Sequence, residues 1–147
     1  MFSSDTLLLG GVTYDKFVAA WPLRSGDAFT DKMNSMKQVV VSRNPSLRLE
    51  WNATLLEGDV VRAVRKLKEQ PGEDILIYGS RTLVQSLMPH GLIDQYRFIV
   101  YPLVLGEGER FFNDGLHRVD LRLVGATTTR EGVTLLTYAS VSAPELA

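Results

Sequence analysis

The hydrophobic pattern of this chain switches repeatedly between short apolar runs and helical spacing, and this alternation most constrains the fold. Apolar runs fall at 6–9, 38–41, 53–56 and 75–78. Most of them are separated by segments with apolar residues about three and four positions apart, the spacing of one helix face. Strands that alternate with helices of this length are typical of crossover units. The pattern therefore predicts a largely parallel sheet with right-handed connections and helices on both faces.

Four helices are expected from this spacing. The first covers 14–21, and Thr13 is its expected N-terminal cap. A weaker helical pattern follows over 29–36. Gly58-Asp59 opens the third helix, and the fourth has its core face over 83–88. Each helix would cover a face of the predicted sheet.

The pattern changes after residue 94. Three segments, 96–105, 120–128 and 133–141, are long, strand-like and free of helical spacing. The residues 130–132 form a turn signal, so the last two strands are expected to pair as an antiparallel hairpin. Pro102 cannot donate a backbone hydrogen bond and marks an edge or a bulge of its strand.

Composition fits one compact domain. The chain has 147 residues, of which 45% are apolar and 22% charged, close to the average of globular proteins. A chain of this length can bury a sizeable core without disulfides or structural metals. We therefore expect a single α/β domain over 1–147, with a mixed sheet that is mostly parallel and has an antiparallel C-terminal hairpin.

Charge and residue usage argue against several kinds of partner. Sixteen basic and 17 acidic residues give a net charge of −1, which does not favour nucleic acid. No apolar run approaches the roughly 20 residues of a membrane span, and the start of the chain lacks a basic leader, so a cytoplasmic location is expected. Without cysteine, and with His90 and His117 outside any HExxH pattern, we expect no metal site.

Two strand-to-helix junctions carry glycine, in LLLGGVTYDKF at 7–17 and ILIYGSRTLVQSL at 75–87. Glycine lets the backbone approach a ligand, and the free N–H groups of the following helix attract anions. Both junctions fall at carboxyl ends of strands, where open α/β sheets bind ligands. Two such turns side by side would suit a diphosphate. The simpler interpretation, that glycine only lets the chain bend, stays open because neither turn matches GxGxxG or a P-loop.

Ser42-Arg43 directly follows the predicted strand QVVV and forms a third strand end. A hydroxyl beside a guanidinium suits a phosphate monoester such as the 2′-phosphate that separates NADP from NAD. Arg81 could act similarly at the second glycine junction. A solvated arginine in a turn is the competing interpretation for both.

The stretch GSRTLVQSLMPHGLIDQYRFIVYPLVLGEGERFF at 79–112 resembles the bacterial riboflavin-biosynthesis reductase C-terminal domain family, which shares the dihydrofolate reductase fold. The glycine-led turn, the helix ending in GLID, the strand running into proline and the VLGEGERFF segment follow in the family's order. LLLGGVTYDKF and VVVSRN resemble the family's first cofactor turn and its next cofactor strand. The resemblance extends from about residue 6 to residue 138.

The resemblance implies an NADPH-dependent, usually dimeric reductase fold and assigns roles to residues of this chain. The cofactor phosphates would be lined by Gly10, Gly11 and Thr13, the adenosine 2′-phosphate by Ser42 and Arg43, and the diphosphate by Gly79, Ser80, Arg81 and Thr82.

The chain departs from the family pattern at three places. Many relatives have arginine where this chain has Gly11, and often a second glycine where it has Ser80. The family's first strand, followed by a segment resembling SLDG, has no counterpart here. In the fold it lies between the strands equivalent to 75–78 and 96–105. A truncated sequence, a strand from another chain and a rearranged sheet are alternative explanations, since unpaired buried backbone is costly.

No residue stands out as a catalytic acid. Asp94 follows a helix as a turn or cap residue. Glu107 and Glu109 flank Gly108 in a loop expected to approach the cofactor, where either could be functional, although solvated loop charges are the preferred interpretation. Tyr78 and Tyr101 are strand aromatics of the kind that usually pack in a core. The catalytic residues therefore stay unassigned.

The sequence supports two functions of different classes. The first is an NADPH-dependent reductase of a small heterocyclic or carbonyl substrate, similar to a pterin or a riboflavin precursor; 5-amino-6-(5-phosphoribosylamino)uracil reductase and dihydrofolate reductase are the enzymes it would resemble. The alternative is a non-catalytic nucleotide-binding or dimerisation module that keeps the fold. A third possibility is a purely structural homodimer that pairs through the long C-terminal strands. A homodimer is expected whichever function holds, because symmetric dimers are the commonest oligomers.

Overall fold

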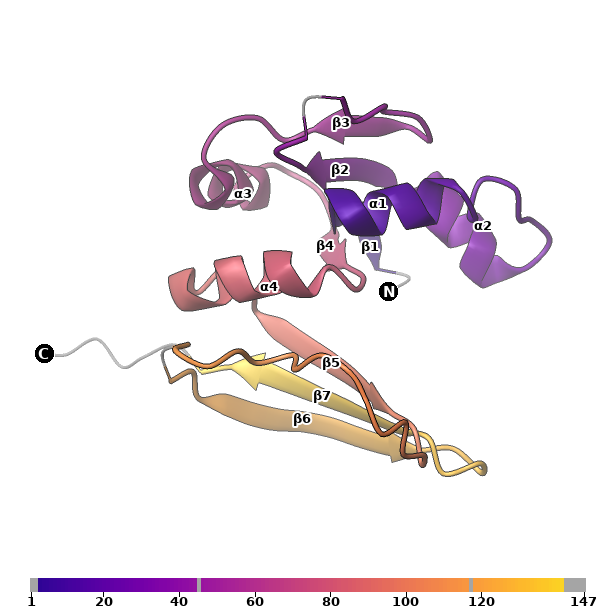
Figure 1. The fold of residues 1–147 in the computed structure, drawn as a ribbon, viewed down its shortest axis with the longest axis vertical. Coiled ribbons are helices and arrows are strands. Elements are labelled where there is room, and N and C mark those ends of the chain that lie inside the picture. Colours follow the sequence, from indigo (N-terminus) through magenta and orange to yellow (C-terminus); the bar gives the residue numbers. More distant parts are fainter. Residues whose placement is uncertain (1–2, 45, 117, 142–147) are drawn as a thin grey trace, which may run out of the picture. The chain divides into compact units, whose positions relative to one another are not determined.

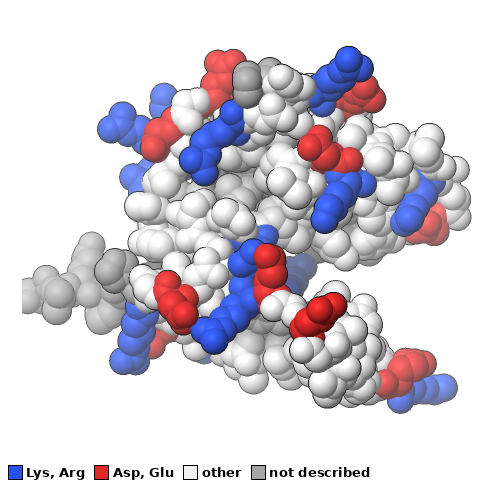
Figure 2. All heavy atoms as spheres, in the orientation of Figure 1, with Lys and Arg blue, Asp and Glu red and all other residues white. Residues whose placement is uncertain are grey.

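The computed structural model describes residues 3–44, 46–116 and 118–141. They group into two compact units, an N-terminal unit, Met1–Val84, and a C-terminal unit, Gln85–Ala147. Within the described ranges, no helix combines the length and the apolar character of a transmembrane span. Figure 2 shows basic and acidic side chains interspersed on the visible face.

The N-terminal unit is built on a four-stranded parallel sheet in the order β3-β2-β1-β4 (Figure 1). The strands are β1 (Ser4–Gly10), β2 (Lys37–Val41), β3 (Ala53–Leu55) and β4 (Asp74–Ile77). In β1 the consecutive residues 7–9 have no exposed surface, so the strand is buried on both faces. This burial explains why its sequence, LLL, is continuously apolar instead of alternating.

Helices cover both faces of this sheet. The unit contains α1 (Gly11–Val18), α2 (Ala28–Ser35) and α3 (Val60–Lys68). The connection from β1 to β2 and the connection from β3 to β4 run across the sheet in opposite directions. Right-handed crossovers that run in opposite directions place their helices on opposite faces.

The main core lies on the face with α1 and α2. Six fully buried side chains form it: Leu7, Leu9, Tyr14, Met33, Met36 and Val40. Asp27 caps α2, since its carboxylate accepts hydrogen bonds from the backbone N–H groups of Phe29 and Thr30.

The C-terminal unit holds a three-stranded antiparallel sheet in the order β5-β7-β6. Its strands are β5 (Gln95–Val100), β6 (Leu121–Thr128) and β7 (Thr134–Ser140), and α4 (Arg81–Leu87) with a short 3₁₀ helix (Met88–His90) leads into it. The turn at 129–133 closes the hairpin of β6 and β7, as the sequence predicts. The expected α/β class, with parallel strands followed by an antiparallel hairpin, is confirmed.

Two expectations about individual elements were wrong. Thr13 does not cap the first helix: α1 begins at Gly11, with Gly10 as an N-cap that has no side chain to offer, and Thr13 lies within its first turn. The strand expected over 96–105 ends at Val100, which pairs with Thr134, the first residue of β7 after the hairpin turn.

The parallel and antiparallel strands form two separate sheets among the described residues. There, β4 pairs only with β1, and β5 pairs only with β7. These two open edges are the ones that the family resemblance places beside its first strand. The structure groups the chain into two compact units, and a single domain over 1–147 stays a prediction.

Candidate functional site

Three strand ends come together at one edge of the parallel sheet. Gly10 at the end of β1 is in register with Val41 of β2, and Leu8 is in register with Ile77 of β4. The residues that follow each strand therefore emerge at the same edge, the usual position of ligand sites in open α/β sheets. They include Gly11 directly after β1, Ser42 directly after β2 and Gly79 two residues after the end of β4.

Gly11 and Ser42 are packed against each other. A Cβ atom added to Gly11 would lie 2.8 Å from Ser42 Oγ and 3.1 Å from Ser42 Cβ. The Ser42 hydroxyl accepts a hydrogen bond of 3.0 Å from the backbone N–H of Asn44, which fixes the turn after β2. This chain has Gly11 where many relatives have arginine, and the structure gives a local reason for the difference. The arrangement of Ser42 leaves no room for a side chain at Gly11.

The second glycine junction touches the first. Gly79 has φ of +68°, and a Cβ added there would lie 3.6 Å from Thr13 Cγ2. The backbone N–H of Gly10 donates a hydrogen bond of 2.9 Å to Ser80 Oγ. Gly10, Thr13, Gly79 and Ser80 therefore meet at one place.

The start of α1 suits an anion. Gly10 is in extended conformation and makes no side-chain cap, so no serine, threonine or aspartate at this position covers the first-turn N–H groups. Glycine at both 10 and 11 keeps side chains away from these groups. Uncapped N–H groups beside a glycine cradle are a favourable environment for phosphate oxygens.

The remaining predicted residues lie next to this cluster along the chain. Arg43 is exposed and directly follows Ser42. Arg81 is half-buried and is the first residue of α4, and Thr82 is exposed in the same turn. Among the described residues, no group of three or more acidic, histidine or cysteine side chains could hold a metal ion, and His117 lies outside the described residues.

Aromatic residues beside the second glycine junction form a cluster that the sequence did not indicate. Tyr78, the residue before Gly79, lies 5.9 Å from Phe17 and 6.4 Å from Phe29 between ring centroids. Trp21 completes the cluster against both phenylalanines. The helical spacing of Phe17 and Trp21 predicted a buried face, but nothing in it indicated that Tyr78 would join them.

Tyr14 fixes the loop that follows Ser42. Its hydroxyl accepts from the backbone N–H of Glu50 at 2.6 Å and donates to the carbonyl of the same residue at 2.8 Å. A fully buried side chain on α1 thus holds the far end of the 42–52 loop. The sequence placed Tyr14 in the core without indicating this polar role.

The acidic residues considered from the sequence belong to the C-terminal unit. Glu107 and Glu109 are exposed in the loop after β5, and Asp94 is exposed before β5, where its carbonyl accepts from the backbone N–H of Ser140. None of these three positions identifies a catalytic acid, and the catalytic residues stay unassigned.

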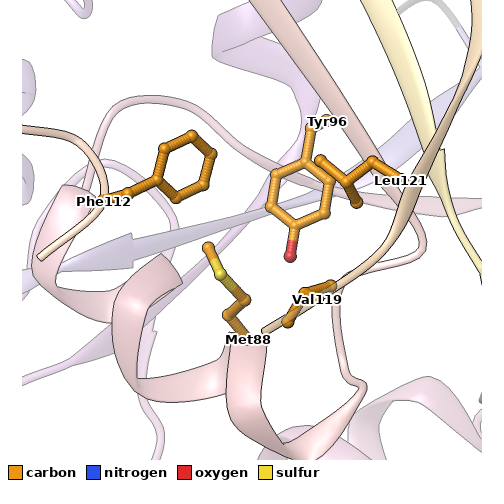
Figure 3. A pocket seen from close by; sticks show the side chains of 5 residues that line it. All are labelled: Met88, Tyr96, Phe112, Val119 and Leu121. Carbon is orange, nitrogen blue, oxygen red and sulfur yellow. The ribbon is translucent and has the colours of Figure 1, made fainter. Parts of the chain in front are cut away.

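A separate apolar cavity of about 290 Å³ lies within the C-terminal unit (Figure 3). Met88, Tyr96, Phe112, Val119 and Leu121 line it, and the Tyr96 ring points its hydroxyl toward Met88 and Val119. Among the described side chains that line the cavity, the phenol is the one polar group and none is charged.

Burial perturbs this phenol. Loss of solvent raises the pKa of Tyr96 above its ordinary value of 10.0, an effect that the hydrogen bond with Ser140 opposes and the negative charge of Asp94 reinforces. The neutral phenol is therefore the form that the folded unit favours.

Comparison with known proteins identifies the family. The model of the RibD C-terminal domain matches residues 1–135. The chain belongs to the RibD C-terminal domain family. The predicted resemblance is thereby confirmed. YyaP of Bacillus subtilis strain 168, an uncharacterized protein, is 32% identical over 139 residues, which cover 91% of this chain and 73% of YyaP.

Solved structures show that this member of the RibD C-terminal domain family shares the fold of dihydrofolate reductase. A putative riboflavin biosynthesis protein from Shewanella sp. PV-4 superimposes with a TM-score of 0.74 at 20% identity, over 95% of this chain and 75% of that one. A dihydrofolate reductase from Enterococcus faecalis, solved with NADP(H) and RAB-propyl, gives 0.62 at 16% identity, over 93% and 74% of the two chains. At these identities the likeness shows the shared fold.

The contact between Gly11 and Ser42 predicts a coupled effect of substitution. Gly11→Ala gains helix propensity of up to about 1 kcal/mol but forces a clash that typically costs about 1–3 kcal/mol. We therefore expect lower stability in urea unfolding followed by tryptophan fluorescence, since Trp21 and Trp51 both pack on the N-terminal core. Adding Ser42→Gly should recover part of the loss.

Gly125→Ala is the matched control, because a Cβ added at Gly125 would meet nothing within 4 Å. Circular dichroism should report unchanged stability for it. Equal losses in Gly11→Ala and in the double variant with Ser42→Gly would contradict the packing described here.

The environment of Tyr96 predicts a loss of stability at alkaline pH. Above about pH 10 the unfolded chain releases the Tyr96 proton while the folded chain keeps it, so stability falls as the pH rises. Between about pH 9 and about pH 11, Tyr96→Phe should lose less unfolding free energy than the unaltered protein. Tyr101→Phe, at an exposed tyrosine, should follow the unaltered protein; identical slopes in all three proteins would contradict the prediction.

Proposed function

We propose that this chain is an NADPH-dependent reductase of a small heterocyclic or carbonyl substrate of the pterin or riboflavin-precursor kind. One observation carries the proposal: the ends of three adjacent parallel strands bring Gly10-Gly11, Ser42 and Gly79-Ser80 into contact at one edge of the sheet. Membership of the RibD C-terminal domain family supports a riboflavin-pathway reductase. The solved relatives named above include a dihydrofolate reductase with NADP(H) bound, which supports the choice of cofactor.

The residues of this edge fit a dinucleotide cofactor. The uncapped first turn of α1 offers N–H groups from Gly11 to Thr13 to phosphate oxygens. A side chain at Gly11 would fill the space beside Ser42, so the cradle depends on glycine. The N–H of Gly10 donates to Ser80 and would not be among the ligand's donors.

The other assigned residues complete the proposed site. Ser42 and Arg43 would bind the adenosine 2′-phosphate, and Gly79, Ser80, Arg81 and Thr82 would enclose the diphosphate. The bound cofactor supplies a hydride, and the chain's task is to orient the two reactants and exclude water. A cytoplasmic location belongs to this proposal, as a chain without cysteine needs no oxidising compartment.

A direct test is titration of the protein with NADPH, followed by the fluorescence of the nicotinamide. Saturable binding below millimolar concentration is expected. Absence of binding at millimolar NADPH would count decisively against the reductase.

Arg43 provides a sharper prediction. Its guanidinium would pair with the 2′-phosphate, so Arg43→Ala should weaken NADPH binding about ten-fold or more while NADH binding changes little. Arg48→Ala, at an exposed arginine of the following loop, is the control and should leave both affinities unchanged. Equal losses for NADPH and NADH in Arg43→Ala would remove the 2′-phosphate role.

The second candidate function is a non-catalytic nucleotide-binding or dimerisation module. The open edges of β4 and β5 favour it, because in the described residues each strand has one partner. Oxidation of NADPH in the presence of a pterin, a flavin precursor or a quinone would exclude this alternative. Binding without turnover for all three substrate classes would favour it over the reductase.

A homodimer is the proposed assembly, with the outer edge of β6 as the contact. Seven of the eight residues of β6 are exposed, no charge follows Arg122 in the strand, and within the described ranges β7 is its single strand partner. An uncharged edge of this length is a template for pairing with another strand. Antiparallel pairing of two copies of β6 would give a symmetric contact.

Sedimentation at micromolar concentration should then show a species of twice 16.4 kDa. Val124→Lys places a charge on the exposed edge and should shift the protein to the monomer. Thr54→Lys, in another strand, is the matched control. A single 16.4 kDa species for the unaltered protein would contradict the dimer.

A further inference from the structure

Ser80 has a backbone conformation that serine rarely adopts. Its φ is +53°, directly after Gly79 at +68°. Residues other than glycine are disfavoured in this left-handed region, because their Cβ atom crowds the neighbouring carbonyl. A residue kept there needs compensating interactions from its surroundings.

The compensating interaction is the hydrogen bond to Gly10. Ser80 is 9% exposed, and its hydroxyl accepts from the Gly10 backbone N–H at 2.9 Å. The register of β1 with β4 ends at Leu8 and Ile77, so Gly10 lies beyond the last ladder pair. The Ser80 side chain continues the link between the two strands where their backbone pairing has stopped.

Ser80 also belongs to the start of α4. Its carbonyl accepts from the backbone N–H of Val84 at 3.0 Å, the first helical bond of α4. The same residue thus joins the end of β1 to the beginning of the helix after β4. On the other side of the turn, Gly79 faces Thr13 of α1 at van der Waals distance.

We infer that Ser80 is a positioning residue that clamps the two glycine junctions together, so that both face one diphosphate. This inference rests on the proposed function, since it concerns the same cofactor site. The hydroxyl acts through the Gly10 N–H and holds the Gly79-Ser80 turn against the first turn of α1. Glycine at position 80 would adopt the same φ more easily but could not make the clamp.

Two substitutions separate this role from a merely structural one. Ser80→Ala removes the hydrogen bond and keeps the strain, so both stability and NADPH affinity should fall. Ser80→Gly removes the hydrogen bond and the strain together. It should unfold at or above the temperature of Ser80→Ala, yet bind NADPH about three- to ten-fold more weakly than the unaltered protein.

Ser46→Ala, at an exposed serine of the 42–52 loop, is the matched control and should bind NADPH normally. Wild-type NADPH affinity in both Ser80 variants would overturn the positioning role. NADPH affinity could instead follow the unfolding temperature across the variants, with Ser80→Gly binding NADPH as tightly as the unaltered protein. Ser80 would then be a structural residue only, and this result would also overturn the positioning role.

Hydrogen exchange of the Gly10 amide tests the clamp without any ligand. Exchange should be faster in Ser80→Ala and Ser80→Gly than in the unaltered protein, because the acceptor is gone. Unchanged exchange would overturn the clamp, even where the protein binds NADPH. Faster exchange in a protein that does not bind NADPH would uphold the clamp and refute the proposed cofactor instead, so the two failures are distinguishable.

Discussion

The parallel pairing of β1 between β2 and β4 is the constraint on which the candidate site depends. A strand whose residues 7–9 are all fully buried can sit only inside a sheet, with a neighbour on each side and helices on both faces. Parallel neighbours end at a common edge, so the chain leaves all three strands at the same place. The meeting of residues that are up to 70 positions apart follows from that burial.

Much of the fold could be predicted because the hydrophobic period is a strong signal. It indicated the four parallel strands, the helices between them and the C-terminal hairpin. The predicted start of the first helix and the predicted end of the strand before Pro102 were wrong. Thr13 looked like a cap by residue type, but α1 starts at Gly11, where no side chain obstructs an earlier turn. The strand before Pro102 ended early, because its partner β7 begins only at Thr134, directly after the hairpin turn.

The site could be predicted only in part, because its packing joins residues distant in sequence. Family resemblance pointed to Gly11 and Ser80 as departures from a pattern. It did not indicate that Gly11 lies against Ser42, or that the Ser80 hydroxyl binds the Gly10 amide. Each departure is explained by a partner on another strand end. The hydrogen bonds of Tyr14 and the ring contacts of Tyr78 stayed hidden for the same reason, since helical and strand spacing place a side chain on a face without indicating its partners.

The central claim is that the three strand ends bind one dinucleotide through its phosphates. Mapping of backbone amide signals by NMR during NADPH titration tests it most directly, because the proposed ligands are mainly N–H groups. The account predicts saturable shifts concentrated at residues 10–13, 42–43 and 79–82, with the shifts at 42–43 reduced for NADH. Shifts confined to the cavity around Tyr96, or no shifts at millimolar NADPH, would contradict it.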